Sequence, residues 1–345
     1  MPTPTISFKP KQVIKRLLSC LPDRACEIII FRYGLGKDEK HMTLDSIGRK
    51  YGITRERVRQ IENYALGIIR KSDEYKAEKA AFVEIEDLLH TLGGMVVEDD
   101  FLGHISKDKS YQNHIHFLLT IGEPFTKRKE DNNFRHRWHA NEELAKKVED
   151  ALHKLYANLS ADDLLPESEM VNRLLQHLEE VSEKYKNQEI MRRWLLISKK
   201  IGKNALGDWG ATHSSNIHTK GVRDYAFLVI RKHGSPIHFR DVAKQIEKLF
   251  DKKAHVATTH NELIKDKRFV LVGRGLYALA EWGYSPGVVR DVIKNILVKG
   301  GAMTKEDVLS KVMKERYVKE NTIAVNLQNP KYFKRDNQGK YTVVA

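Results

Sequence analysis

Residues 43–70 read TLDSIGRKYGITRERVRQIENYALGIIR, and this stretch decides the fold of the N-terminal part of the chain. Thr43 can cap a first helix and Thr54 a second, while Gly52 lies between them where the chain must turn. Apolar residues recur at helical spacing in both segments: Leu44, Ile47 and Tyr51 in the first, and Val58, Ile61, Ala65 and Ile68 in the second. Two short amphipathic helices joined by a tight glycine turn predict a helix-turn-helix.

Polar side chains crowd the start of the second helix on the face opposite its apolar residues. The candidates for DNA contact are Thr54, Arg55, Glu56, Arg57, Arg59 and Gln60, together with Thr43 and Lys50 of the first helix. A helix in the major groove reads bases with its N-terminal residues, and Arg, Glu and Gln match the edges of guanine, cytosine and adenine. The alternative for such a face is an ordinary solvated surface.

Residues 21–70 also resemble a known family, region 4 of the primary-type bacterial RNA polymerase sigma factors. The matching motifs are LPxRxxEIIxxRYGL, TLxxIGxxYG and TRERVRQIExxAL. The resemblance implies a domain that binds the minus-35 promoter hexamer and docks on the flap of the polymerase β subunit. It further implies that Arg55, Glu56 and Gln60 read bases and that Arg59 contacts phosphate. Only 20 residues precede Leu21, so we do not expect a stand-alone sigma factor that opens promoters.

The charge of the chain is concentrated at its two ends. The formal net charge is +14 over 345 residues, with +6 in residues 1–75, −3 in residues 76–220 and +11 in residues 221–345. Because nucleic-acid binders gain affinity by neutralising phosphates, this distribution favours two DNA-facing portions joined by a near-neutral middle.

Downstream, one pattern recurs: amphipathic helices followed by a hydrophobic strand, a polar turn and an aromatic-bearing strand. These closing segments lie at residues 116–139, 194–210, 267–283 and 331–345. Three helices and a hairpin in about 65 residues are the layout of a winged helix. The predicted fold class is mainly α with small β-hairpins, arranged as a helix-turn-helix domain followed by tandem winged-helix-like modules. The expected parts are residues 1–75, 76–140, 141–210, a linker at 211–221, and modules at 222–284 and 285–345.

Residues 222–283 resemble the HARE-HTH winged-helix family, which occurs in the RNA polymerase delta subunit, in chromatin regulators and in some restriction enzymes. The resemblance rests on a helix with HF, followed by RF, G, Y-L and W. In the two C-terminal modules we expect DNA contacts from the third helix and the wing. The candidates are His255, Thr258, Thr259, His260, Asn261, Lys265, Lys267, Arg268 and Arg274 in the first of the two, and Lys319, Asn321, Thr322, Asn326, Lys331, Lys334, Arg335 and Lys340 in the second. The wings of the middle modules also read as basic, at Lys127–Lys129 and Arg135–His139.

No catalytic signature is evident: the chain has no glycine-rich phosphate loop, nucleophile elbow or HExxH motif. We therefore expect a non-enzymatic DNA-binding transcription regulator without cofactor or metal, whose partner is double-stranded DNA, with the RNA polymerase core as a second candidate partner. The alternatives are a polymerase-associated accessory factor and the DNA-binding subunit of a restriction or defence system. Without an apolar segment of membrane length, a signal peptide or zipper heptads, we expect a cytoplasmic, nucleoid-associated monomer.

Overall fold

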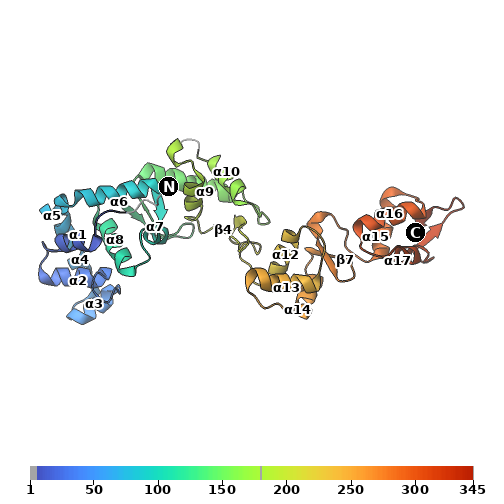
Figure 1. Ribbon diagram of the computed structural model, residues 1–345, viewed down its shortest axis with the longest axis horizontal. Coiled ribbons are helices and arrows are strands. Elements are labelled where there is room, and N and C mark those ends of the chain that lie inside the picture. The colour runs from blue at the N-terminus through green and yellow to red at the C-terminus, as the bar shows by residue number, and fades with distance from the viewer. Residues whose placement is uncertain (1–5, 179–180, 345) are drawn as a thin grey trace. The chain divides into compact units, whose positions relative to one another are not determined.

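The computed structural model describes residues 6–178 and 181–344 (Figure 1). The chain divides into two compact units, one made of residues 1–202 and 209–212 and the other of residues 203–208 and 213–345. Helices dominate both units, and the strands form small antiparallel sheets. The predicted fold class, mainly α with small hairpins, is confirmed.

Four helices form the N-terminal bundle, residues 10–71: α1 (Pro10–Leu18), α2 (Asp23–Tyr33), α3 (Leu44–Tyr51) and α4 (Arg55–Lys71). The predicted helix-turn-helix is confirmed as α3 and α4. Ile28, Ile47 and Val58 are fully buried and join α2, α3 and α4 in a small core of their own. A second, larger core begins on the other side of the bundle and continues into the next module.

The first winged helix, residues 79–139, follows the short helix α5 (Asp73–Ala77). Its elements are α6 (Lys79–Thr91), β1 (Met95–Val97), α7 (Glu98–Ile105), α8 (Lys109–Ile121), β2 (Thr126–Arg128) and β3 (Arg137–His139), and its sheet has the order β1-β3-β2. The prediction of a hydrophobic strand from residue 116 was wrong. Residues 116–121 form the end of α8 instead. Ile115, Phe117 and Leu118 point in different directions around this helix, and all three are buried because the core surrounds it on several sides.

Three further modules repeat the order of three helices and a closing hairpin, and the third module also has a strand after its first helix. The second comprises α9 (Glu142–Ala157), α10 (Glu167–Leu175), η1 (Glu183–Tyr185), α11 (Gln188–Leu195), β4 (Ile201–Lys203) and β5 (Trp209–Ala211). The third comprises α12 (Val222–His233), β6 (Ile237–His238), α13 (Phe239–Phe250), α14 (Val256–Lys265), β7 (Phe269–Gly273), β8 (Leu276–Leu279) and η2 (Ala280–Trp282). The fourth comprises α15 (Val289–Gly300), α16 (Lys305–Glu315), α17 (Glu320–Leu327), β9 (Phe333–Arg335) and β10 (Tyr341–Val343).

The sheets of these modules share one connectivity. The third winged helix has the order β6-β8-β7, which repeats the first-last-middle order of the first winged helix. In the second and fourth, the first strand is reduced to a single bridge, Leu165 with Trp209 and Met303 with Tyr341. Each hairpin predicted from the closing segments is therefore present, which confirms tandem winged-helix-like modules after the helix-turn-helix domain.

Part of the predicted linker, residues 211–221, is packed in the second compact unit. Ile217 and Asn216 are buried, and the Asn216 carbonyl accepts a hydrogen bond from the Asn204 amide. Within the same unit, the backbone N–H of Tyr317 donates to the Val272 carbonyl (2.7 Å), so the fourth module contacts an edge of the third module's wing.

Candidate nucleic-acid interface

The turn between α3 and α4 is fixed by caps and by two glycines. The Thr43 hydroxyl accepts the Ser46 N–H (3.1 Å) at the start of α3, and the Thr54 hydroxyl accepts the Arg57 N–H (3.2 Å) at the start of α4. Gly52 ends α3 with φ +66°, the left-handed conformation that favours glycine. A Cβ on Gly48 would lie 2.6 Å from the Ile53 carbonyl oxygen, so this position also needs glycine.

A buried carboxylate fixes α4 against α2. Glu62 lies in the middle of α4 with only 8% of its surface exposed. It accepts hydrogen bonds from the Tyr33 hydroxyl (2.9 Å) and from Arg32 Nε (3.3 Å). Burial and the nearby Glu62 raise the pKa of Tyr33, so the hydroxyl remains a donor. We did not predict Glu62, although a charged residue four positions after Val58 on the apolar face was a usable signal.

The predicted readers on α4 are all exposed. Their hydrogen bonds stay within the helix: Arg59 donates twice to the Glu56 carboxylate (2.9 and 2.6 Å), and Arg57 donates to the Gln60 side-chain oxygen (3.1 Å). The Arg59 hydrogen bonds lower the pKa of Glu56, which therefore stays ionised. Because both partners face solvent, such pairs are weak and can be exchanged for contacts to a ligand.

An open groove runs along the turn of the helix-turn-helix. The residues that line it include the basic Arg49, Arg55 and Arg57 and the acidic Asp45, together with Gly52 and Thr54 of the turn. Arg49 is a further candidate for phosphate contact that the sequence analysis did not name. Lys50, which was named, is exposed and has its ammonium 3.6 Å from the centre of the Phe31 ring. The hydroxyl of Thr43, also named, already accepts a hydrogen bond as the N-cap of α3.

The C-terminal candidates fall on two modules of the other compact unit. Arg274 is exposed in the short turn between β7 and β8 of the third winged helix. Lys319 is the N-cap of α17, Asn321 is exposed in its first turn, and Lys334 is exposed on β9. The last three thus share the fourth winged helix.

One expectation for the third winged helix was wrong, that of DNA contact by Thr259. Thr259 is fully buried, and its hydroxyl donates to the His255 carbonyl (3.1 Å), so it cannot reach a groove. Arg268 is held by Asp224 (3.1 Å) and Asp266 (2.7 Å). His260 stacks on Phe239 with ring centres 4.2 Å apart.

In the wing of the first winged helix, three of the basic side chains are paired with carboxylates. Lys127 lies 2.5 Å from Glu98, and Arg128 forms ion pairs with Glu142 and Glu149. Arg137 is 4% exposed and also contacts Glu149. The wing is basic in sequence, as described above, but these three cations are paired with carboxylates of the same protein.

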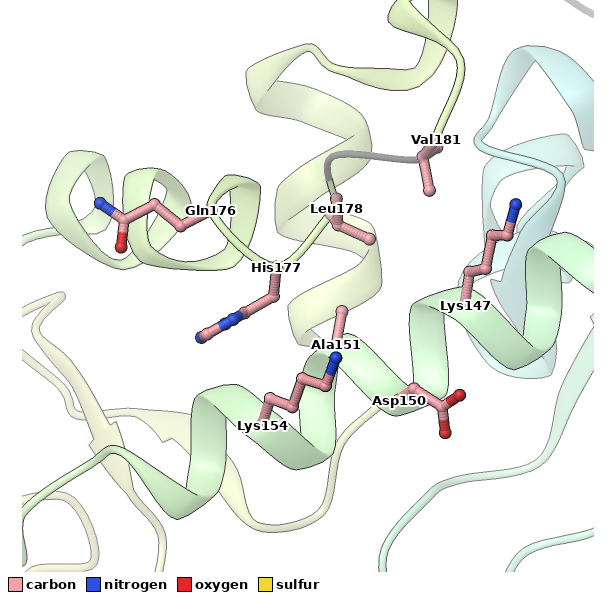
Figure 2. Close-up of a pocket in the computed structure, with 8 residues that line it drawn as sticks. All are labelled: Lys147, Asp150, Ala151, Lys154, Gln176, His177, Leu178 and Val181. Atoms are coloured by element: carbon pink, nitrogen blue, oxygen red, sulfur yellow. The ribbon is translucent and has the colours of Figure 1, made fainter.

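A separate hollow of about 320 Å³ lies beside α9 in the second winged helix. Lys147, Asp150 and Lys154 come from α9, and Gln176 and His177 come from the end of α10 and the segment after it (Figure 2). Lys147 pairs with Glu143 (2.8 Å). This hollow contains no cysteine or serine nucleophile.

Comparison with known proteins supports the N-terminal resemblance. Residues 17–71 match the family sigma-70, region 4. The principal sigma factor HrdD of Streptomyces griseus is 48% identical over 50 residues, which is 14% of this chain and 15% of that protein. The sigma factor RpoS of Coxiella burnetii is 47% identical over 57 residues, 16% of each chain. RpoD of Neisseria gonorrhoeae is 35% identical over 79 residues, 22% of this chain and 12% of that protein.

The N-terminal bundle is thus similar to sigma region 4, a helix-turn-helix domain of transcription proteins. The chain covers only about a sixth of the length of these curated relatives. The similarity therefore characterises this domain and not the other modules. In the part of the chain that the structure describes, no helix is both long enough and apolar enough to span a membrane. Within the same residues, no group of three or more His, Cys, Asp or Glu side chains could hold a metal ion.

Proposed function

We propose that this protein is a DNA-binding transcription regulator that reads a minus-35-like promoter element with α4 in the major groove. The observation that supports this proposal most directly is the free polar face at the start of α4, in a domain similar to sigma region 4. Arg55 and Gln60 are exposed there, and the caps and the buried Glu62 hold the helix that presents them. In this role Arg55, Glu56 and Gln60 contact bases, and Arg59 contacts phosphate once it leaves Glu56.

The test compares binding of the full chain to a minus-35-like duplex and to a scrambled duplex of equal length. Arg55→Ala and Gln60→Ala should each reduce the discrimination by about 1–3 kcal/mol, because each removes a contact to a base edge. Lys15→Ala, an exposed lysine on α1, is the matched control and should leave the discrimination unchanged. Unchanged discrimination in both α4 variants would show that this helix does not read bases.

We also propose contact with the RNA polymerase core, because the matching relatives are RNA polymerase sigma factors. In this mode the protein acts by binding and performs no catalysis. Co-purification of core polymerase with the full chain should survive nuclease treatment if the contact is between proteins. Loss of the polymerase on nuclease treatment would mean that DNA bridges the two.

A further inference from the structure

The fourth winged helix, residues 289–343, carries basic side chains at the start of its third helix and along its wing. Among the described residues, none of its five cations at the start of α17 and on the wing forms an ion pair: Lys319, Lys331, Lys334, Arg335 and Lys340. The acidic residue next to Lys319 is Glu320, which is exposed and does not form an ion pair with it. The acidic residue of the wing turn, Asp336, is occupied by the backbone N–H groups of Gln338 (2.9 Å) and Lys340 (2.8 Å).

The helix and the wing that carry these cations are built on one core. Ile323 and Leu327 of α17 pack in the same buried cluster as Phe333 of β9 and Tyr341 of β10. Arg335 Nε donates to the Gly339 carbonyl (3.3 Å), which leaves the rest of its guanidinium at the tip of the hairpin. The positive charges are therefore held on a rigid helix and hairpin and not on a loose tail.

One exposed face of α17 is neutral. Asn321, Val325 and Gln328 lie one helical turn apart, and all three are exposed, Val325 to 60%. A neutral helix face beside a cationic hairpin suits the groove and the flanking phosphates of a duplex, since phosphate contacts supply most of the affinity of nucleic-acid binders.

We propose that the fourth winged helix is a second duplex-DNA site, which binds the phosphate backbone through Lys319 of α17 and through the wing cations Lys331, Lys334, Arg335 and Lys340. This site rests on the proposed DNA-binding function and extends it, but it does not depend on base reading by α4. Its ligand is the DNA backbone irrespective of sequence. The C-terminal part of the chain then adds affinity and the N-terminal bundle adds selectivity.

The test measures binding of the full chain to a scrambled duplex between 0.1 and 0.5 M salt. The double variant Lys319→Ala, Lys334→Ala removes two phosphate contacts. The slope of the logarithm of the affinity against the logarithm of the salt concentration should therefore become shallower by about 1.8. If the variant and the wild type bind equally at 1 M salt, this difference in slope makes the variant bind roughly 60-fold more weakly than the wild type at 0.1 M. Lys319 makes no side-chain cap hydrogen bond and Lys334 forms no ion pair, so both substitutions should leave the fold intact.

The matched control is Lys294→Ala with Lys299→Ala, which removes the same charge from exposed positions of α15 in the same module. An equal loss in the control would overturn the site, because charge anywhere on the module would then suffice. An unchanged salt dependence in the test variant would also overturn it. If the test variant loses more affinity for double-stranded RNA than for double-stranded DNA, the surface binds RNA and the proposal of a DNA site is wrong.

The same pair of substitutions should have the same effect in an Arg55→Ala, Gln60→Ala background. If α4 fails to discriminate sequences while this effect persists, base reading fails and the second site stands. If discrimination is normal and the effect is absent, the second site fails and base reading stands.

Discussion

The first and the fourth winged helices share one order of elements but use their third helix and wing in opposite ways. In the first, α8 is buried on several sides, with Asn113, His114, Ile115, Phe117, Leu118, Leu119 and Ile121 all inside the core. In the fourth, only Ile323 and Leu327 of α17 are buried. The wing of the first is tied by ion pairs, whereas the wing of the fourth has none among the described residues.

What surrounds α8 explains the difference. The helix packs against α1, α2 and α4 of the N-terminal bundle, in a core that is continuous from Val13 to Trp138. Arg70 of α4 donates to the last carbonyls of α8, Thr120 (2.8 Å) and Ile121 (3.0 Å). The wing is also held from its other end, since the backbone N–H of Lys199, in the second winged helix, donates to the Asn133 carbonyl of this wing (2.7 Å). The first winged helix thus supports the N-terminal bundle, and its third helix and wing are used for packing.

The largest effect that this comparison predicts is on the free energy of unfolding, when the third helix of each module is mutated. Phe117 of α8 is fully buried and packs edge to face with Tyr33 at 4.9 Å between ring centres. Phe117→Ala should lower the free energy of unfolding by about 3–5 kcal/mol, because it leaves a cavity between α8 and the bundle. Urea titration of the full chain, with hydrogen exchange of the α1 and α8 peptides, measures this loss.

The matched substitution on α17 is Val325→Ala. Val325 is exposed, so the free energy of unfolding should change by no more than about 0.5 kcal/mol. Similar losses for the two variants would mean that α17 is also covered, which would contradict the comparison.

The next effect concerns the wings. Glu98 at the start of α7 accepts a hydrogen bond from Trp138 Nε1 (2.8 Å) and lies 2.5 Å from Lys127 and 3.5 Å from His116. Burial alone would raise the pKa of Glu98, but the hydrogen bonds from His116 and Lys127 outweigh it and lower the pKa to about 2. The carboxylate therefore stabilises the fold above pH 4.5, and this contribution is lost as the pH falls toward 2.

Glu98→Gln should accordingly lower the free energy of unfolding at pH 7 by about 3 kcal/mol, with the difference from wild type vanishing near pH 2. Urea titrations at several pH values between 2 and 7 give both quantities. On the fourth wing, Lys334→Ala removes a cation without an ion pair and should leave stability unchanged. A difference between Glu98→Gln and wild type that does not depend on pH would point to lost packing and not to the charge.

The sequence predicted the local structure well because local chemistry determines it. Thr43, Gly52 and Thr54 fix the ends of α3 and α4 through caps and a left-handed turn, and each is visible in the sequence as a residue type. The two C-terminal hairpins were equally predictable from a hydrophobic strand, a polar turn and an aromatic-bearing strand. The exposed readers on α4 followed from the helix period, once its apolar face was assigned.

The sequence could not reveal which modules leave their third helix and wing exposed. The basic run at Lys127–Lys129 reads like any other wing, and only the fold brings Glu98 and Glu149 to it. Phe117 fits a strand as well as a helix until its neighbours on α2 are known. Burial of Thr259 likewise depends on how α14 is rotated against its module, which helical spacing alone does not fix.

The smallest of the three effects tests how specifically the bundle and α8 recognise each other. Asn113 is 2% exposed, and its amide donates to the carbonyls of Gly34 (3.0 Å) and Glu39 (2.9 Å), while its oxygen lies 2.8 Å from His41 Nε2. Asn113→Ala should lower the free energy of unfolding by about 1–3 kcal/mol, because it leaves these buried groups without partners. Asn321→Ala on the exposed face of α17 is the counterpart and should change it by less than about 0.5 kcal/mol. If Asn113→Ala is as mild as its counterpart, water replaces the amide and the docking of α8 depends on apolar packing alone.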